Sequence, residues 1–150
     1  TSVRTFDAAS FLRRCGADTK LVHRLFEEDI SSIKCKAEIL AGMQLVDGTI
    51  AIASCPDHVE EAQILAGQVA DYLVTIKEIR ASFLFYQTDK GLCLSARSDG
   101  SVNVQVVMEA LGGGGHLTVA GAQLGKEGNK ESAEKVIIAQ VRKQIKEEKE

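Results

Sequence analysis

The chain has 150 residues, of which 45% are hydrophobic and 26% charged, and this ordinary globular composition excludes wholesale disorder. Its 18 Lys and Arg against 21 Asp and Glu give a formal net charge of -3, which excludes a general basic field for duplex nucleic acid but leaves a local positive pocket open. No apolar run approaches the roughly 18 to 20 residues that span a bilayer. We expect one globular domain, or one domain with a piece of another. Because the N-terminus has neither Met nor a basic leader, an excised fragment is expected.

The first 46 residues favour helices. A short helix is predicted from Thr5, a suitable N-cap, to a stop at Gly16. Asp18 is predicted to cap a second helix, and the apolar spacing over 31–45 predicts a third, connecting helix. The Asp-Gly turn signal that follows residue 46 is the predicted boundary between two parts of the chain.

Beyond that turn, strand and helix patterns are interspersed. In chain order we expect a strand in "GTIAIAS", a helix capped by Asp57, a hairpin of "RASFLFYQ" and "LCLSARS" joined by "TDKG", a helix after Gly100, a short strand in "AGAQL", and an amphipathic helix over 131–146. This order predicts an α/β fold with a mixed β-sheet flanked by helices and preceded by a short helical segment.

The four cysteines form no C-x-x-C pair and have no nearby histidine at zinc-ligand spacing. We predict reduced, mostly buried thiols of a cytosolic protein, with a disulfide pair as the less favoured alternative. The cysteines are Cys15, Cys35, Cys55 and Cys93.

Four glycines, Gly112 to Gly115, directly precede His116 in the run "LGGGGHLTVAGAQL". Glycine orders at a high entropic cost, so the run needs a reason. Backbone N–H groups bared by glycines at a helix terminus form an anion-binding concavity. His116, at the start of a helix beginning "HLTVA", would add a ring N–H donor for a phosphate. A tight turn with His116 as a surface cap is the alternative, because the sequence has neither the P-loop pattern nor G-x-G-x-x-G.

A second polar stretch, "SARSDGSVNVQ", precedes the helix that leads to the glycines. Arg97 ends the predicted strand, and a guanidinium presents forked donors to phosphate oxygens, to which the hydroxyl of Ser98 adds a neutral bond. The alternative is an exposed hairpin end whose Ser and Asn residues cap the next helix. Because this stretch and the glycines flank the same short helix, they are placed to converge on one ligand.

The chain has no recognisable hydrolytic centre. Two-metal phosphoesterases need several Asp and His ligands clustered around ions about 3.5 to 4 Å apart. The three histidines, His23, His58 and His116, lie in different contexts, and Asp57 in "PDHVEE" is interpreted as a helix cap. No nucleophile is paired with a base at a recognisable elbow, so the residues favour binding over chemistry.

The two polar motifs, "SARSDGSVNVQVVMEAL" followed by "GGGGHLTVAGAQL", resemble the C-terminal DHH-associated domain, subfamily-1 type, of DHH phosphoesterases. Among these the chain is most similar to cyclic-di-AMP phosphodiesterases of the GdpP type. The stretch "RTFDAASFLRRCGADTKLVHRLFEEDI" resembles the final helices of the preceding DHH domain. The resemblance therefore implies that residues 1–46 are the tail of a DHH domain with a connecting helix, and that 47–150 are a DHH-associated substrate-binding domain.

The resemblance implies a set of substrate contacts. They are Arg97, Ser98, Gly113, Gly114, Gly115 and His116, with Ser95, Asn103 and Thr118 as weaker candidates. The implied substrate is a cyclic dinucleotide or short adenine nucleotide, with cyclic-di-AMP hydrolysed to linear pApA by the parent enzyme.

The resemblance implies that the catalytic groups lie elsewhere in the parent protein. The DHH domain would hold two metal ions, usually manganese, through motifs upstream of residue 1. This chain alone is therefore expected to bind no metal and to lack phosphodiesterase activity. The resemblance also implies a membrane-anchored parent with this domain on the cytoplasmic face.

One position departs from the family pattern. After the histidine the family commonly has a small or amide residue where this chain has Val119, so a polar contact with the ligand is not expected there.

Three other roles are alternatives to the leading one, the third being a purely structural or dimerisation role that leaves the four glycines unexplained. The same superfamily also hydrolyses short oligoribonucleotides and adenosine bisphosphate, and a phosphate-binding loop does not itself read the base. A nucleic-acid-binding module of the alanyl-tRNA editing type is disfavoured by the acidic charge and by 5% aromatic residues, and binding of duplex nucleic acid is not expected. Homodimer formation through an exposed sheet edge is left open.

Overall fold

The structure is a computed structural model that describes residues 2–57, 59 and 61–147. The chain divides into two compact units, Thr1–Ile33 and Lys34–Glu150. Each unit is described by itself.

The first unit contains α1 (Val3–Arg14), α2 (Thr19–Arg24) and the start of α3 (Ile30–Ala41). The predicted cap of the second helix is confirmed, because the Asp18 carboxylate accepts a hydrogen bond from the backbone N–H of Lys20 at 2.8 Å. The predicted cap of the first helix is wrong: Ser2 is the N-cap of α1, and its carbonyl accepts from the N–H of Thr5 at 3.0 Å. Neither α1 nor α2 has a buried residue.

The end of the predicted third helix is also wrong. Helix α3 stops at Ala41, and residues Gln44–Val46 form strand β1, which pairs antiparallel with β2 (Ile50–Ser54). Asp47 and Gly48 make the turn between these strands with φ of 50° and 71°, a left-handed conformation that Asp and Gly adopt readily. The sequence signal for a turn is therefore confirmed, and the turn joins two strands of one sheet.

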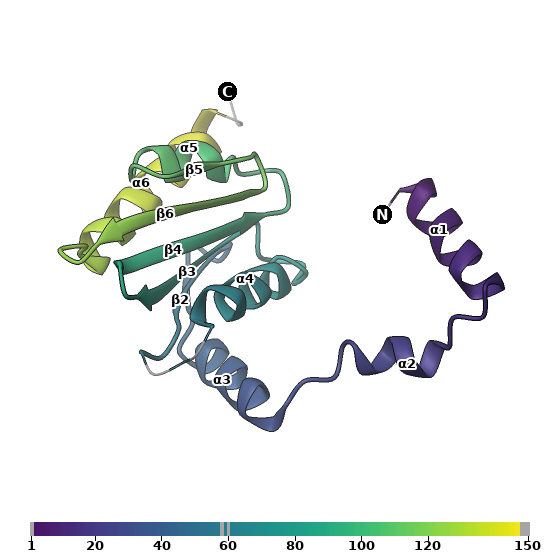
Figure 1. Cartoon of the computed structure of the whole chain (residues 1–150). Coiled ribbons are helices and arrows are strands. Elements are labelled where there is room, and N and C mark those ends of the chain that lie inside the picture. The colour runs from purple at the N-terminus through teal and green to yellow at the C-terminus, as the bar shows by residue number, and fades with distance from the viewer. Residues whose placement is uncertain (1, 58, 60, 148–150) are drawn as a thin grey trace. The chain divides into compact units, whose positions relative to one another are not determined.

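The second unit is built on a six-stranded mixed sheet with the order β1-β2-β3-β4-β6-β5, shown in Figure 1. Strands β2 and β3 (Ala81–Thr88) are parallel and are connected through helix α4 (Ala62–Leu73). The other neighbouring pairs are antiparallel, through β4 (Gly91–Ser98), β6 (Val119–Gly125) and β5 (Gly114–Gly115). The predicted α/β fold with a mixed sheet and an N-terminal helical segment is confirmed.

Two local predictions in this unit need correction. The β3–β4 hairpin has a shorter loop than predicted, because Thr88 already pairs with Gly91. Helix α4 begins at Ala62, with Glu61 as its N-cap at φ 55°, so Asp57 does not cap it. The interpretation of "PDHVEE" also involved His58, which lies outside the described residues.

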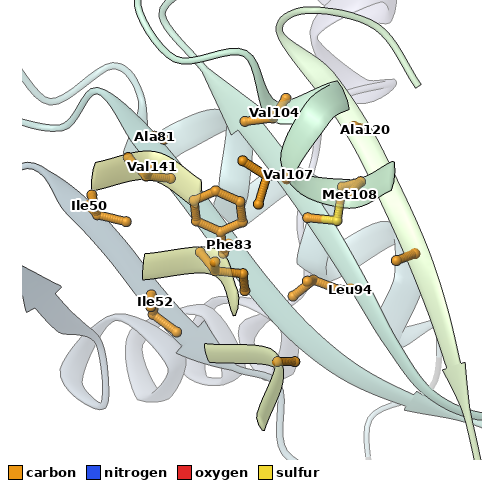
Figure 2. Close-up of a cluster of buried hydrophobic side chains, with 14 of the residues drawn as sticks. Ile50, Ile52, Ala81, Phe83, Leu94, Val104, Val107, Met108, Ala120 and Val141 are labelled. Carbon is orange, nitrogen blue, oxygen red and sulfur yellow. The ribbon is translucent and has the colours of Figure 1, made fainter. Parts of the chain in front are cut away.

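Hydrophobic residues fill both faces of the sheet because the strands alternate. Ile50 and Ile52 of β2 point to one face, and Ala51 and Ala53 point to the other. The first face is covered by α5 (Val104–Glu109) and α6 (Lys130–Glu147), and Figure 2 shows Phe83 at the centre of this cluster. Helices α3 and α4 cover the second face (Figure 1), and several of the side chains buried there are alanines.

All four cysteines are free thiols, and two of them, Cys55 and Cys93, are buried. Burial, together with the nearby Cys35, raises the pKa of the Cys55 thiol to about 11, so this side chain stays a neutral thiol. Cys15 is exposed and Cys35 is intermediate, so the predicted burial holds for half of the set. None of the described helices is long and apolar enough to cross a membrane.

Candidate functional site

The glycine run follows the C-terminus of α5. Gly112 takes φ 76°, and its N–H donates to the carbonyl of Glu109 at 3.0 Å. The N–H of Gly113 donates to the carbonyl of Met108 at 2.8 Å. Both N–H groups therefore bond to carbonyls at the end of α5, as glycines after a helix commonly do, and neither is left to bind a ligand.

The next part of the run is a tight β-hairpin, not the start of a helix. Strand β5 pairs with β6, and the N–H of His116 donates to the carbonyl of Val119 at 2.7 Å. The prediction that His116 begins a helix is therefore wrong, and no helix dipole acts at this histidine. Its side chain is exposed.

Close packing against β6 explains two of the four glycines. A Cβ at Gly113 would lie 2.2 Å from the carbonyl oxygen of Gly121, and one at Gly115 would lie 2.5 Å from the Cα of Ala120. Real side chains do not approach so closely, so only glycine fits at both positions. Gly114 is different, because a Cβ there would have no atom within 4 Å.

The hairpin leaves one glycine amide on the outer edge of the sheet. In an antiparallel ladder alternate residues bond to the partner strand, and His116 already donates to Val119. Gly115 is the next residue along and pairs opposite Ala120, so its N–H points away from β6. Since β5 is an edge strand, this N–H is a backbone donor available to a ligand.

Arg97 lies on β4 and is held by two hydrogen bonds. Its Nε donates to Oδ1 of Asp71 on α4 at 2.7 Å, and its Nη1 donates to the carbonyl of Ala96 at 3.0 Å. The Arg97 side chain is only 18% exposed, whereas that of Asp71 is 62% exposed. The guanidinium is therefore fixed at the sheet surface beside α4.

A cleft of about 510 Å³ opens next to Arg97. Its floor is the part of β4 and β6 where Ser95 pairs with Gly121, a residue that adds no side chain. Gln63 of α4 and Gln123 of β6 contribute polar side chains. The cleft thus combines one cation with amide and hydroxyl groups, which suits an anionic ligand that also carries hydrogen-bonding groups.

The structure brings only part of the predicted site into this cleft. Arg97, Ser95 and Gly113 line it, together with Gly112. His116, Gly114 and Gly115 belong to the adjoining hairpin and are not among its lining residues. A contact between them and a ligand stays a prediction.

Three further predicted residues hold the backbone together. Ser98 is buried, and its Oγ accepts from the N–H of Gly100 at 3.3 Å and donates to the carbonyl of Leu117 at 3.5 Å. Asn103 caps α5, because its side-chain Oδ1 accepts from the N–H groups of Gln105 and Val106. Thr118 accepts through its carbonyl from the N–H of Ser98 at 3.0 Å. Only Asn103 matches the alternative in which the polar stretch caps the next helix, because Ser98 is buried and, among the described residues, makes no contact with α5 that caps it. A role in binding for these three residues stays a prediction.

Sequence reasoning missed two residues of α4: Gly67, which lines the cleft, and Asp71, which binds Arg97. They are one helical turn apart, and both face Arg97, which lies 26 residues after Asp71. The available signal was a glycine in the middle of a helical pattern with a carboxylate four residues later. It missed Tyr86 as well, whose pKa is raised by burial first and by the nearby Cys93 second.

The described residues do not supply a metal site. They contain no group of three or more His, Cys, Asp or Glu side chains that could hold an ion. The metal pair that the family resemblance implies would be held by the preceding DHH domain, and the described residues of this chain offer no donor set for it.

Residues 47–143 match the family model of the DHHA1 domain. This span is more than half of the chain, so the chain belongs to the DHHA1 domain family.

Curated relatives are phosphodiesterases of a cyclic dinucleotide. The chain is 49% identical over 127 residues to the cyclic-di-AMP phosphodiesterase GdpP of Bacillus subtilis (strain 168), covering 83% of this chain and 19% of the relative. It is 41% identical over 142 residues to the cyclic-di-AMP phosphodiesterase PdeA of Listeria monocytogenes serotype 1/2a (strain 10403S), covering 94% and 22%. The chain thus spans about a fifth of the length of these relatives.

Solved structures share the fold at lower identity. An exopolyphosphatase-related protein from Bacteroides fragilis is 21% identical with a TM-score of 0.76, covering 95% of this chain and 44% of that one. A pGpG-specific phosphodiesterase, PggH from Vibrio cholerae, is 14% identical with a TM-score of 0.56, covering 75% and 39%. At these identities the likeness concerns the fold alone.

Proposed function

We propose that this chain is the substrate-binding part of a metal-dependent phosphodiesterase that hydrolyses cyclic-di-AMP to linear pApA. The observation that carries the proposal is the 41% to 49% identity, over most of the chain, to cyclic-di-AMP phosphodiesterases. In this proposal the chain binds and orients the dinucleotide, and the part of the parent that it lacks cleaves the phosphodiester.

The chemistry of the cleft supports the binding role. Arg97 offers a charged donor to a phosphate oxygen, and the outward N–H of Gly115 offers a backbone donor at the neighbouring edge. The amides of Gln63 and Gln123 can both donate and accept, which suits the edge of an adenine base. Donors fixed on a phosphate also orient it for in-line displacement and stabilise the charge that develops there.

His116 is proposed to act from the hairpin next to the cleft. Its exposed ring carries an N–H that can donate to a phosphate oxygen of a ligand lying across β5 and β6. Gly114 and Gly115 keep this part of the surface free of side chains, so a phosphate can approach the backbone.

The reaction itself is assigned to the preceding part of the parent. We propose that residues 1–46 are the end of a DHH domain with its connecting helix, and that 47–150 form the substrate-binding domain. Manganese ions in the DHH domain would activate the attacking water and stabilise the leaving oxygen. The parent is proposed to be anchored in a membrane, with this domain on the cytoplasmic face.

A calorimetric titration of the chain with cyclic-di-AMP tests the binding role, with His116→Ala as the paired variant. We expect saturable binding that His116→Ala weakens by about tenfold, the cost of losing one hydrogen bond to a charged group. In the full-length, manganese-loaded protein the same substitution should lower turnover strongly. Turnover close to that of the unsubstituted full-length protein would contradict the role given to His116.

The products identify the substrate. We expect the full-length protein to convert cyclic-di-AMP to pApA, and the 150-residue chain with added manganese to release none. Faster release of mononucleotides from short oligoribonucleotides, or of phosphate from adenosine bisphosphate, would instead favour the other activities of the superfamily.

A further inference from the structure

A glycine interrupts the middle of helix α4. Gly67 lies in a helix of 12 residues whose neighbouring positions, Ala66 and Gln68, carry ordinary helix-forming side chains. Glycine is the poorest helix former after proline, so a glycine here weakens α4 unless the missing side chain serves a purpose.

The guanidinium of Arg97 occupies the space that a side chain at position 67 would need. A Cβ at Gly67 would lie 3.4 Å from Nη2 of Arg97, so an alanine would just touch this nitrogen and a longer side chain would displace it. Asp71 follows one helical turn later, on the same face of α4, and accepts from Nε at 2.7 Å. Together Gly67 and Asp71 form a seat for the guanidinium on α4.

This seat fixes which donors of Arg97 remain. Nε is bound to Asp71 and Nη1 to the carbonyl of Ala96, both in geometry that holds the guanidinium plane. Among the described residues Nη2 has no hydrogen-bond partner, and Arg97 lines the cleft. Arginine otherwise loses considerable rotamer freedom when it binds a ligand, and a side chain that is already held avoids most of that cost.

We propose that Asp71 is a positioning residue, which holds Arg97 so that Nη2 of the arginine meets a phosphate oxygen of the dinucleotide. Gly67 contributes by leaving space for the guanidinium. The proposal rests on the proposed function, because it assumes that a phosphate enters the cleft beside Arg97. Asp71 itself makes no contact with the ligand in this scheme.

Simple electrostatics predicts the opposite effect of removing Asp71. A carboxylate beside an anion site repels the ligand, and it also competes with the phosphate for the guanidinium, so its loss should tighten binding. Positioning predicts that its loss weakens binding. The direction of the change therefore distinguishes the two roles.

The first measurement follows Arg97 without any ligand, by NMR of its Nε–H in the 150-residue chain. We expect a distinct resonance that exchanges slowly with water, because the hydrogen is held by a carboxylate at a side chain that is 18% exposed. In Asp71→Ala this resonance should move to the averaged chemical shift that exposed arginines share. Arg97→Lys should remove the resonance, which assigns it to Arg97. A resonance that Asp71→Ala leaves unchanged would overturn the proposal whatever the ligand is.

The second measurement is the affinity for cyclic-di-AMP in the same chain and in the full-length protein. Asp71→Ala should weaken binding by about three- to tenfold, the cost of ordering one long side chain at the moment of binding. Glu78→Ala removes the same charge from an exposed loop position outside the cleft and should change affinity by less than about twofold, since a screened distant charge contributes little.

A matched pair at position 67 tests the space rather than the charge. Gly67→Leu should weaken binding about as much as Asp71→Ala, since the longer side chain displaces the guanidinium. Gly67→Ala should weaken binding less than Gly67→Leu does, because its methyl group only touches Nη2. Both substitutions replace glycine with a better helix former, so circular dichroism should show no loss of helix content in either variant.

The outcomes separate the two proposals. Tighter binding by Asp71→Ala, or equal binding by Gly67→Leu and Gly67→Ala, would overturn the positioning role while leaving the proposed function in place. If neither the unsubstituted 150-residue chain nor the unsubstituted full-length protein binds cyclic-di-AMP, the proposed function is overturned. The part of this inference that concerns the ligand is then overturned with it. The Arg97 resonance would then still report whether the seat itself exists.

Discussion

Single residues show that the four consecutive glycines serve different purposes. Gly112 ends a helix with a positive φ, Gly113 and Gly115 let the backbone lie against β6, and Gly114 meets no steric demand. The sequence predicts one shared reason for the run, either an anion-binding backbone or a tight turn. The structure gives separate reasons for separate positions, because distances to β6 decide which side chains fit.

Matched alanine substitutions at neighbouring glycines should differ sharply in stability. Gly113→Ala places a Cβ 2.2 Å from the carbonyl oxygen of Gly121 and forces the backbone apart, so we expect it to lower the free energy of unfolding by about 2 kcal/mol or more. Gly114→Ala has open space and should stay within about 0.5 kcal/mol of the parent. Urea titrations followed by circular dichroism measure both, and equal midpoints for the two variants would contradict this account of the loop.

At the scale of elements, segments with a side-chain pattern were predicted well, and these include the short strand in "AGAQL", which lies within β6. The two shortest strands were not predicted. Strand β2, the β3–β4 hairpin, α5 and α6 follow from alternation, turn residues and helical spacing. Strand β1 has three residues and β5 has two glycines, so neither carries a side-chain pattern that could reveal it. The helix predicted from His116 fails because pairing with β4 draws Val119 and the residues after it into a strand.

The same limit applies to the candidate site. Arg97 and Gly113 were predicted from local motifs and Ser95 only from the family resemblance, and all three line the cleft. Asp71 and Gly67 reach Arg97 only through the packing of α4 on the sheet, a contact that no spacing in the linear sequence discloses.

The cap of α5 provides a prediction at this scale. The Asn103 side chain accepts from the N–H groups of Gln105 and Val106, so Asn103→Ala should lower the free energy of unfolding by about 1 kcal/mol. Asn103→Asp retains the cap and should restore most of that loss. Chemical denaturation gives the stabilities. Weaker binding of cyclic-di-AMP by Asn103→Asp, measured alongside, would indicate that Asn103 also contacts the substrate.

At the scale of the second unit, one ion pair joins its first turn to its last helix. Arg142 of α6 donates from Nε to Oδ2 of Asp47 at 2.7 Å and from Nη2 to Oδ1 at 2.9 Å. Hydrogen bonding to Arg142, with its positive charge, lowers the pKa of the Asp47 carboxyl below its usual 3.8. The pair connects residues 95 positions apart, so it reports on closure of the whole unit.

This pair predicts a pH dependence with a definite sign. A carboxyl whose pKa is lowered by folding stabilises the protein above its unfolded pKa, and that stabilisation disappears as the pH falls through the folded pKa. Asp47→Asn keeps a residue that tolerates the φ of 50° and removes the charge. We therefore expect a slightly lower melting temperature than that of the unsubstituted chain at pH 7, by a few degrees at most because both side chains are exposed. The two melting temperatures should converge as the pH falls through the lowered pKa of Asp47. A difference that persists undiminished at pH 2.5, or that vanishes in the mid-neutral range, would contradict the role of the pair.

The first unit has a consequence for how the chain unfolds. Helices α1 and α2 bury no residue, and Phe6, Phe11, Leu25 and Phe26 are 61% to 80% exposed. Helices of 12 and 6 residues without such burial are marginal in water, so their amide hydrogens exchange with solvent through local opening at little cost in free energy. We expect the amide hydrogens of the central strands β2, β3 and β4 to exchange mainly when the second unit opens as a whole. A single melting curve for this chain therefore reports two processes, a gradual loss of helix in the first unit and a cooperative transition in the second.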